Sequence, residues 1–119
     1  MHGRHTFSKR ERLQYGHQFR SIYERGRKLD GRLVVLYVLE APATSRGVGV
    51  VTSRRIGGAV QRNRARRLLR EVYRLNKHKL KPHLQIVMVA RIGINGKRYA
   101  DVEACVLDLL QAAGALIES

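Results

Sequence analysis

Three short apolar runs predict the strands of a sheet. They are rich in valine, isoleucine and leucine, which favour extended backbone in runs of this length, and they span residues 32–41, 48–53 and 84–90. The segment APATSRG, which separates the first two runs, is typical of a turn because it combines proline, glycine and small polar residues. We therefore expect the first two strands to pair as an antiparallel hairpin.

Three further segments repeat apolar residues at the three- and four-residue spacing of an amphipathic helix. They span residues 16–26, 59–79 and 100–113. In the last segment one helix face collects Val102, Val106, Leu109, Leu110 and Ala113. Because strands and helices mix along 119 residues without internal repeats or linkers, the pattern predicts a single α+β domain over residues 1–119. We expect residues 1–14 to form a flexible basic arm.

The composition favours a globular domain that works in a reducing compartment. Hydrophobic residues make up 44% of the chain, yet no apolar run approaches the roughly 18 residues that a membrane span needs. The N-terminal segment MHGRHTFSKRER is basic and lacks the apolar stretch of a secretory signal. A single cysteine, Cys105, cannot form an internal disulfide, so we expect a cytoplasmic protein. The position of Cys105 in an apolar helix pattern predicts that its side chain is buried and packs as a small hydrophobic group.

Charge is the most informative part of the composition. The chain has 24 lysines and arginines against nine acids, a net charge of +15. All the basic residues lie within residues 1–100, whereas residues 101–119 carry four acids and no basic residue. A charge this high indicates a polyanionic partner, and nucleic acid is the leading candidate. A membrane surface is the weaker alternative, since a basic amphipathic peptide needs no patterned domain to bind one.

The charge is concentrated on the predicted helix 59–79. Around its helical wheel, one arc of apolar residues contains Ala65, Leu68, Leu69 and Val72. A separate arc contains Arg62, Asn63, Arg66, Arg67, Arg70 and Arg74, while Arg64 stands on the far flank of the apolar arc. An ordinary solvated face would alternate with acids, but Glu71 is the only acid between residues 59 and 75. Arginine suits bidentate contacts to phosphate, and Gly57-Gly58 would let a phosphate approach the helix N-terminus.

Aromatic residues suggest a second binding surface. Phe19 and Tyr23 share one face of the predicted helix 16–26, and Tyr37 lies in the first predicted strand. Single-stranded RNA is held by aromatic side chains placed beside positive charge. Core packing is the alternative for each ring; for Phe19 the two readings are balanced, and Tyr37 is expected to face RNA.

The sequence shows little catalytic chemistry of its own. Protein-borne metal-dependent nucleases cluster carboxylates around their ions, but the nine acids here are scattered. The five histidines show no metal-ligand spacing, and Ser21 and Ser53 have no evident base nearby in sequence. We therefore expect the catalytic groups of any reaction that the chain serves to lie outside it.

The motif SRRIGGAVQRNRARRLLRE, preceded by FRSIYERGR and LVVLYVL, resembles the protein subunits of bacterial ribonuclease P. The resemblance runs from about Arg12 to the last helix, and its most specific part is the RNR box, residues 62–64, after the lead-in that begins at Ser53. It implies an α/β sandwich like the second domain of ribosomal protein S5, with a mixed sheet of about four strands. The arginine helix would lie in a left-handed βαβ crossover, an exception to the usual handedness.

The resemblance also implies a function. Ribonuclease P removes the 5′ leader from precursor tRNA by endonucleolytic cleavage, with a catalytic RNA whose Mg²⁺ is held mainly by RNA and substrate. The protein would bind the catalytic RNA and the leader, with no DNA or membrane partner. The residues that match the face toward the catalytic RNA are Arg54, Arg55, Arg62, Asn63, Arg64, Arg66, Arg67 and Arg70. Those that match the leader-binding cleft are Phe19, Tyr23, Tyr37 and Arg91.

Two positions depart from the family pattern. Gly58 replaces the asparagine usual before Ala-Val, and Gln18 stands where an acid often precedes the helix phenylalanine. A side-chain contact at the first position and a capping or metal-linked role at the second are therefore in doubt.

Two other functions remain open on the sequence alone. A ribosomal or other structural RNA-binding protein is compatible with the charge and the fold, although the RNR lead-in argues against it. DNA binding is disfavoured because no helix-turn-helix arrangement precedes the basic helix. The RNA that co-purifies with the chain would discriminate between a catalytic RNA and ribosomal RNA.

Overall fold

The computed structural model describes residues 12–13, 16–41 and 46–117. Its helices are α1 (Gly16–Arg25), α2 (Ala59–Asn76) and α3 (Tyr99–Ala112). Its strands are β1 (Arg27–Asp30), β2 (Val34–Glu40), β3 (Gly47–Val51) and β4 (Leu84–Ala90). Three short 3₁₀ turns connect them, η3 (Arg54–Ile56), η4 (Lys77–Lys79) and η5 (Ile92–Ile94). The predicted α+β class is confirmed.

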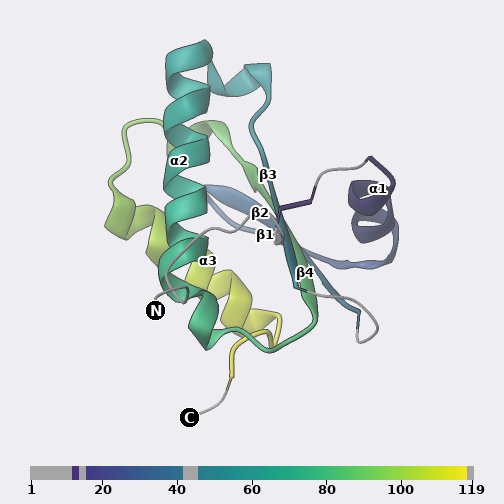
Figure 1. Ribbon diagram of the computed structural model, residues 1–119. Coiled ribbons are helices and arrows are strands. Elements are labelled where there is room, and N and C mark those ends of the chain that lie inside the picture. Colours follow the sequence, from purple (N-terminus) through teal and green to yellow (C-terminus); the bar gives the residue numbers. More distant parts are fainter. Residues whose placement is uncertain (1–11, 14–15, 42–45, 118–119) are drawn as a thin grey trace.

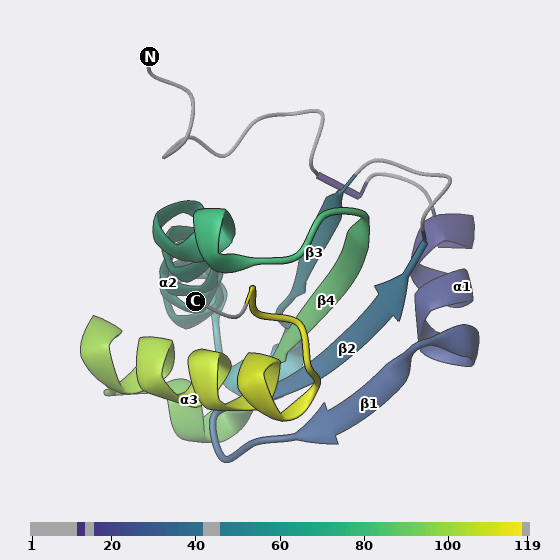
Figure 2. The same cartoon turned by 90° about the horizontal axis from the view of Figure 1, so that it is seen from below.

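The elements form three layers around one mixed sheet. In Figure 1 the helices α2 and α3 cover one face of the sheet and α1 covers part of the other. The view from below in Figure 2 shows α1 and α3 on opposite sides of the strands. The core lies between the sheet and the helix pair, where fully buried side chains include Leu36, Leu69, Ile86, Met88 and Val106.

The strand order β1-β2-β4-β3 contradicts the predicted hairpin. β2 and β3 are not neighbours, because β4 lies between them, antiparallel to β2 and parallel to β3. The physical reason is burial: β4 has more buried residues than any other strand, and Val87 is buried on the face opposite to Leu84, Ile86 and Met88. Such a strand is best covered in the middle of a sheet. α2 therefore serves as the crossover between the parallel strands β3 and β4.

The strand β1 was not predicted. Its sequence RKLD carries three charged residues in four and only one apolar residue, Leu29, which is half-buried. It is an edge strand held by antiparallel pairing to β2, and charge on an edge strand discourages pairing with another chain.

The predicted helices are confirmed, with one change at the end of α2. The α-helix ends at Asn76 and tightens into η4, whereas we expected a helix to residue 79. Asn76 is buried, and its side-chain amide donates to Val72 O (2.9 Å) and to Glu103 Oε2 (2.8 Å). These bonds tie the last turn of α2 to α3.

The N-terminal segment was expected to be a loose arm as far as residue 14. Residues 1–11 and 14 lie outside the described residues. Arg12 forms a parallel bridge with Val48, and the Leu13 N–H donates to Val48 O at 2.9 Å. Residues 12–13 are therefore bound to β3, an edge strand whose unpaired backbone groups are available to this segment.

The single thiol, Cys105, is only half-buried on α3. It packs against the core, next to Gly31 at the β1–β2 turn. Cys105 therefore packs as a small hydrophobic side chain, as predicted, but it is less buried than we expected.

Candidate nucleic-acid interface

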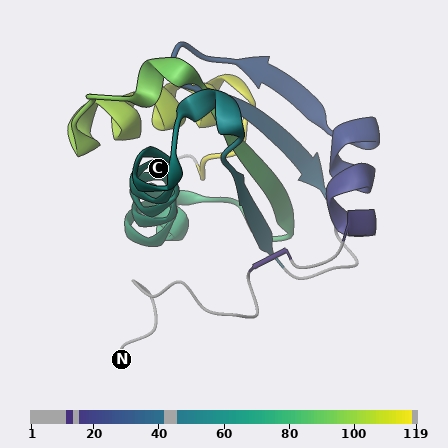
Figure 3. The same ribbon diagram turned by 90° about the horizontal axis from the view of Figure 1, so that it is seen from above.

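One face of α2 presents five arginines and one asparagine, which we call the arginine face: Arg62, Asn63, Arg66, Arg67, Arg70 and Arg74. The opposite side of the helix buries Ala65, Leu69 and Val72 in the core. Figure 3 shows α2 packed along the sheet, away from α1. The division of the helix into an apolar and an arginine-rich side, which the wheel predicted, is thus confirmed.

Intramolecular hydrogen bonds hold Arg62 and Arg66 in place. Arg66 Nη1 donates to Asn63 Oδ1 and Arg66 Nη2 donates to Thr52 Oγ1, both at 2.8 Å. Arg62 Nη1 donates to the Gly57 carbonyl at 3.3 Å. Because Thr52 follows the last residue of β3, the edge of the sheet positions Arg66, and side chains held in this way lose less entropy when they bind a ligand.

An open hollow lies within the arginine face. We call it the arginine hollow; it is lined by Asn63, Arg66, Arg67, Arg70 and Glu71. Partial burial lowers the pKa of Arg70, and the positive charges of Arg12 and Arg66 lower it further. Like charges gathered in this way repel one another unless an anion lies against them.

Glu71, the single acid on this side of α2, is bound to another residue of the same helix. Arg74 Nε and Nη2 donate to its two carboxylate oxygens at 3.0 and 2.5 Å. These hydrogen bonds hold the pKa of Glu71 below its usual value and raise that of Arg74. Glu71 is therefore paired with Arg74, and it lines the arginine hollow together with three arginines.

The remaining predicted cationic residues lie around the N-terminal end of α2. Arg64 lies on the far flank of the helix, as the helical wheel predicted, and its Nη2 donates a hydrogen bond to the Lys97 carbonyl. Arg54 and Arg55 are exposed on η3, where the Ser53 side chain accepts the Arg55 N–H at 3.3 Å. The structure therefore gathers residues 63, 66, 67 and 70 in one hollow and leaves Arg54, Arg55 and Arg64 outside it.

The two glycines before α2 have different roles. Gly57 has a φ of 138°, a conformation that side chains disfavour. Gly58 is the N-cap residue and makes no side-chain cap hydrogen bond. Its lack of a side chain leaves the first helical N–H groups open to a ligand.

Three aromatic rings gather on the opposite face of the sheet, and we call them the aromatic surface: Phe19, Tyr23 and Tyr37. The Tyr23 and Tyr37 rings meet edge to face with centroids 4.8 Å apart, and Phe19 lies 6.4 Å from Tyr23. Tyr23 is 41% exposed. Partial burial and the neighbouring Tyr37 raise the pKa of Tyr23.

The Phe19 ring packs α1 against the backbone of β3. A Cβ atom added to Gly49 of β3 would lie 2.5 Å from Phe19 Cε1, so the ring rests directly on the strand. The same helix buries Ile22 completely. Phe19 is half-buried, as is Tyr37, and Tyr37 is not a member of the buried core cluster.

Arg91, the fourth residue assigned to the leader cleft, lies farther along the same face. Tyr37 pairs with Val87 in the sheet register, so Arg91 lies four positions, or about 13 Å, along the strand direction from Tyr37. Its backbone N–H donates to Leu33 O at 2.9 Å. Its side chain lies 3.9 Å from the Asp30 carboxylate. The structure therefore brings the three rings together and places Arg91 at the other end of this face.

Comparison with known proteins decides the family. The sequence model of the Ribonuclease P family matches residues 7–114. The chain belongs to the ribonuclease P protein family. The ribonuclease P protein component of Clostridium botulinum is 37% identical over 107 residues, which cover 89% of this chain and 96% of the relative. That of Clostridium acetobutylicum is 37% identical over 111 residues, 92% of this chain and 93% of the relative.

Solved structures of ribonuclease P proteins share the fold. The protein from Thermotoga maritima superposes with a TM-score of 0.77 at 27% identity, covering 92% of this chain and all of that one. The protein from Staphylococcus aureus gives a TM-score of 0.82 at 23% identity, with coverage of 92% and 100%. The fold is therefore that of the family's solved members. Membership of the family makes this chain part of a tRNA-processing ribonuclease, and the ribosomal alternative is set aside.

Metal ligands do not gather within the described part of this ribonuclease P protein. Among those residues no group of three or more histidine, cysteine, aspartate or glutamate side chains could hold an ion. Nor is any helix of that part long and apolar enough to cross a membrane.

Two residues that act on the arginine face were not identified from the sequence. Thr52 positions Arg66, and Arg12 brings a further positive charge toward Arg70. Neither carried a local signal, because both act through contacts between segments distant in the chain. Only the general basic character of residues 1–14 hinted at Arg12.

Proposed function

We propose that the arginine face binds the catalytic RNA of ribonuclease P and that the aromatic surface binds the 5′ leader of precursor tRNA. The holoenzyme would remove the leader by endonucleolytic cleavage in the cytoplasm. The observation that carries the proposal is the convergence of Asn63, Arg66, Arg67 and Arg70 on one hollow. Guanidinium groups in such a cluster match the phosphates of a folded RNA.

The position of the aromatic surface supports a separate role for it. It lies on the face of the sheet opposite to α2 (Figure 1), so an RNA that covers the arginine face leaves the rings of α1 and β2 accessible. Exposed rings bind unpaired nucleotides by stacking, and a leader is single-stranded. Arg91 would contact leader phosphates beyond the rings.

Catalysis would reside in the RNA partner. In the proposed holoenzyme, Mg²⁺ held mainly by RNA and substrate would supply the chemistry of phosphodiester hydrolysis. The residues of this chain would position RNA and leader through Arg66 and Tyr37 and their neighbours. No group of ligands for the ion is found among the described residues.

The direct test is reconstitution. The purified chain, freed of RNA, should not cleave precursor tRNA in the presence of Mg²⁺. Addition of the ribonuclease P RNA of the source organism should produce mature 5′ ends, with tighter binding of precursor than the RNA achieves alone. Robust cleavage by the protein alone that survives nuclease treatment of the preparation would contradict an RNA-borne active site.

Salt dependence tests the arginine face as the RNA-binding surface. Each phosphate neutralised by the chain releases counterions, so affinity for the ribonuclease P RNA should fall with a log–log slope of about −0.7 to −0.9 per phosphate contact. Titrations between low and moderate salt measure the slope. A flat response would show that the arginines do not form the interface.

A further inference from the structure

A second hollow lies beside the arginine hollow, in the groove where α3 begins against α2. We call it the α2–α3 hollow; its volume is about 480 Å³, and it is lined by Arg67, Leu68, Glu71, Leu75 and Tyr99. Arg67 and Glu71 line both hollows. The two depressions are therefore adjacent on one flank of α2 and share these two side chains.

The two hollows differ in chemistry. The arginine hollow is lined by polar and charged side chains alone, whereas Leu68, Leu75 and Tyr99 give the α2–α3 hollow an apolar floor. Leu68 and Tyr99 are half-buried and pack against the core on their inner sides. Such an arrangement offers fixed apolar surface immediately next to a cluster of positive charge.

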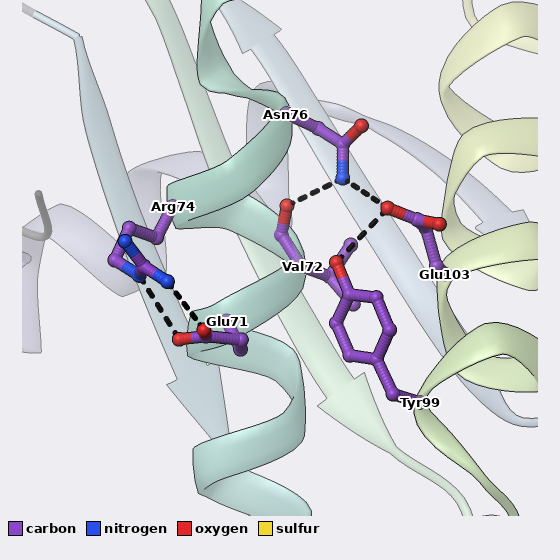
Figure 4. A network of polar contacts seen from close by, with 6 residues as sticks. All are labelled: Glu71, Val72, Arg74, Asn76, Tyr99 and Glu103. Atoms are coloured by element: carbon purple, nitrogen blue, oxygen red, sulfur yellow. Dashed lines mark hydrogen bonds and ion pairs between the residues drawn. The ribbon is translucent and has the colours of Figure 1, made fainter. Parts of the chain in front are cut away.

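The Tyr99 ring is held by a hydrogen bond at its far end. Its hydroxyl donates to Glu103 Oε2 at 2.9 Å, and the same oxygen accepts the Asn76 amide at 2.8 Å. Figure 4 shows this network between α2 and α3, next to the Glu71–Arg74 pair. Burial and the Glu103 carboxylate raise the pKa of Tyr99 to about 12, so the hydroxyl remains a donor near neutral pH. The ring is thus fixed in position without any ligand.

We propose that the α2–α3 hollow receives one unpaired nucleobase of the RNA whose phosphates lie on the arginine face. Tyr99 would contact the plane of the base, Leu68 and Leu75 would contact its edges, and Arg67 would bind the phosphate at the rim. The inference rests on the proposed function. It adds a base-binding site that contains Tyr99, which lies outside the residues assigned to the arginine face or the aromatic surface.

Charge complementarity selects RNA as the occupant. A hydrophobic protein segment seated here would have to desolvate Arg67 beside Arg66 and Arg70 without supplying an anion, which is costly. A nucleotide supplies both parts, a phosphate for the rim and a flat, partly apolar base for the floor. Unstacked bases in RNA loops and bulges characteristically bind to aromatic and arginine side chains.

The test compares three substitutions in the full chain, each assayed for affinity to the ribonuclease P RNA. Tyr99→Leu should weaken binding by about tenfold, because a base–aromatic contact contributes on this scale. Tyr99→Phe keeps the ring but loses the hydroxyl bond to Glu103, so its loss of affinity should be clearly smaller than that of Tyr99→Leu. Leu75→Gln makes the apolar floor of the hollow polar and leaves the Tyr99–Glu103–Asn76 hydrogen bonds in place. It should also weaken RNA binding, so it provides a second test if Tyr99→Leu folds poorly.

Chemical probing of base reactivity in the bound RNA identifies the nucleotide. One unpaired base, protected by the wild-type chain, should become reactive in the Tyr99→Leu complex while the rest of the footprint stays the same. Removing that base should weaken the wild-type complex but add nothing to the effect of Tyr99→Leu.

Three results would overturn the base site. The first is that Tyr99→Leu leaves both the RNA affinity and the footprint unchanged. The second is that Tyr99→Phe and Tyr99→Leu lose RNA affinity equally. The third is that Tyr99→Leu abolishes binding of a protein to the chain while RNA binding stays intact. Failure of the proposed function is distinguishable, because Arg66→Ala would then also leave RNA affinity unchanged.

Discussion

Replacement of Arg66 by alanine is expected to weaken assembly with the ribonuclease P RNA by roughly ten- to a hundredfold. A hydrogen bond to a charged group contributes about 1.5–3 kcal/mol, and Arg66 is held in place by hydrogen bonds to Thr52 and Asn63. Arg62→Ala should act in the same direction. The measurement is the affinity of each variant for the RNA, with thermal unfolding to establish that the variant is folded.

Two further variants separate a specific contact from a loss of net charge. Arg32→Ala removes the same charge from the β1–β2 turn, outside the arginine face, and should bind RNA almost as the wild-type chain does. Thr52→Val retains Arg66 but removes its anchor at 2.8 Å, so it should give an intermediate loss. Equal affinities for Arg66→Ala, Arg32→Ala and the wild-type chain would show that the arginine face is not the assembly surface.

Replacement of Tyr37 by alanine is expected to act on substrate rather than on assembly. Stacking of a base on an aromatic ring contributes about 1–3 kcal/mol, which corresponds to a loss of roughly five- to a hundredfold in affinity. The loss should appear for precursor tRNA with a leader of several nucleotides. Mature tRNA and a precursor with a one-nucleotide leader should be almost unaffected, because neither reaches the aromatic surface.

The experiment measures substrate affinity against leader length at saturating ribonuclease P RNA. Tyr37→Phe keeps the ring and its contact with Tyr23 and should behave as the wild-type chain. Val35→Ala changes a half-buried residue on the same face of β2 without an aromatic ring and serves as the matched control. If Tyr37→Ala weakens binding equally at every leader length, the assignment of Tyr37 to a leader site is wrong.

The sequence by itself determined the features of this protein that depend on local periodicity. Three helices, the strands β2, β3 and β4 and the division of α2 into an apolar and an arginine-rich side follow from the local pattern alone, because each residue's face is set by its near neighbours. The edge strand β1 escaped prediction because RKLD has no apolar run. The family could also be recognised early, because the RNR box and its lead-in are contiguous.

Only the tertiary structure decided what depends on contacts between distant segments. The place of β4 between β2 and β3 follows from its burial on both faces, which no turn signal between residues 41 and 47 could reveal. The anchoring of Arg66 by Thr52 and the approach of Arg12 to Arg70 join segments that are far apart in the chain. The α2–α3 hollow exists because the start of α3 brings Tyr99 beside Leu68 and Leu75. Pairing and packing of this kind depend on the whole chain's burial of apolar surface, so local sequence cannot specify them.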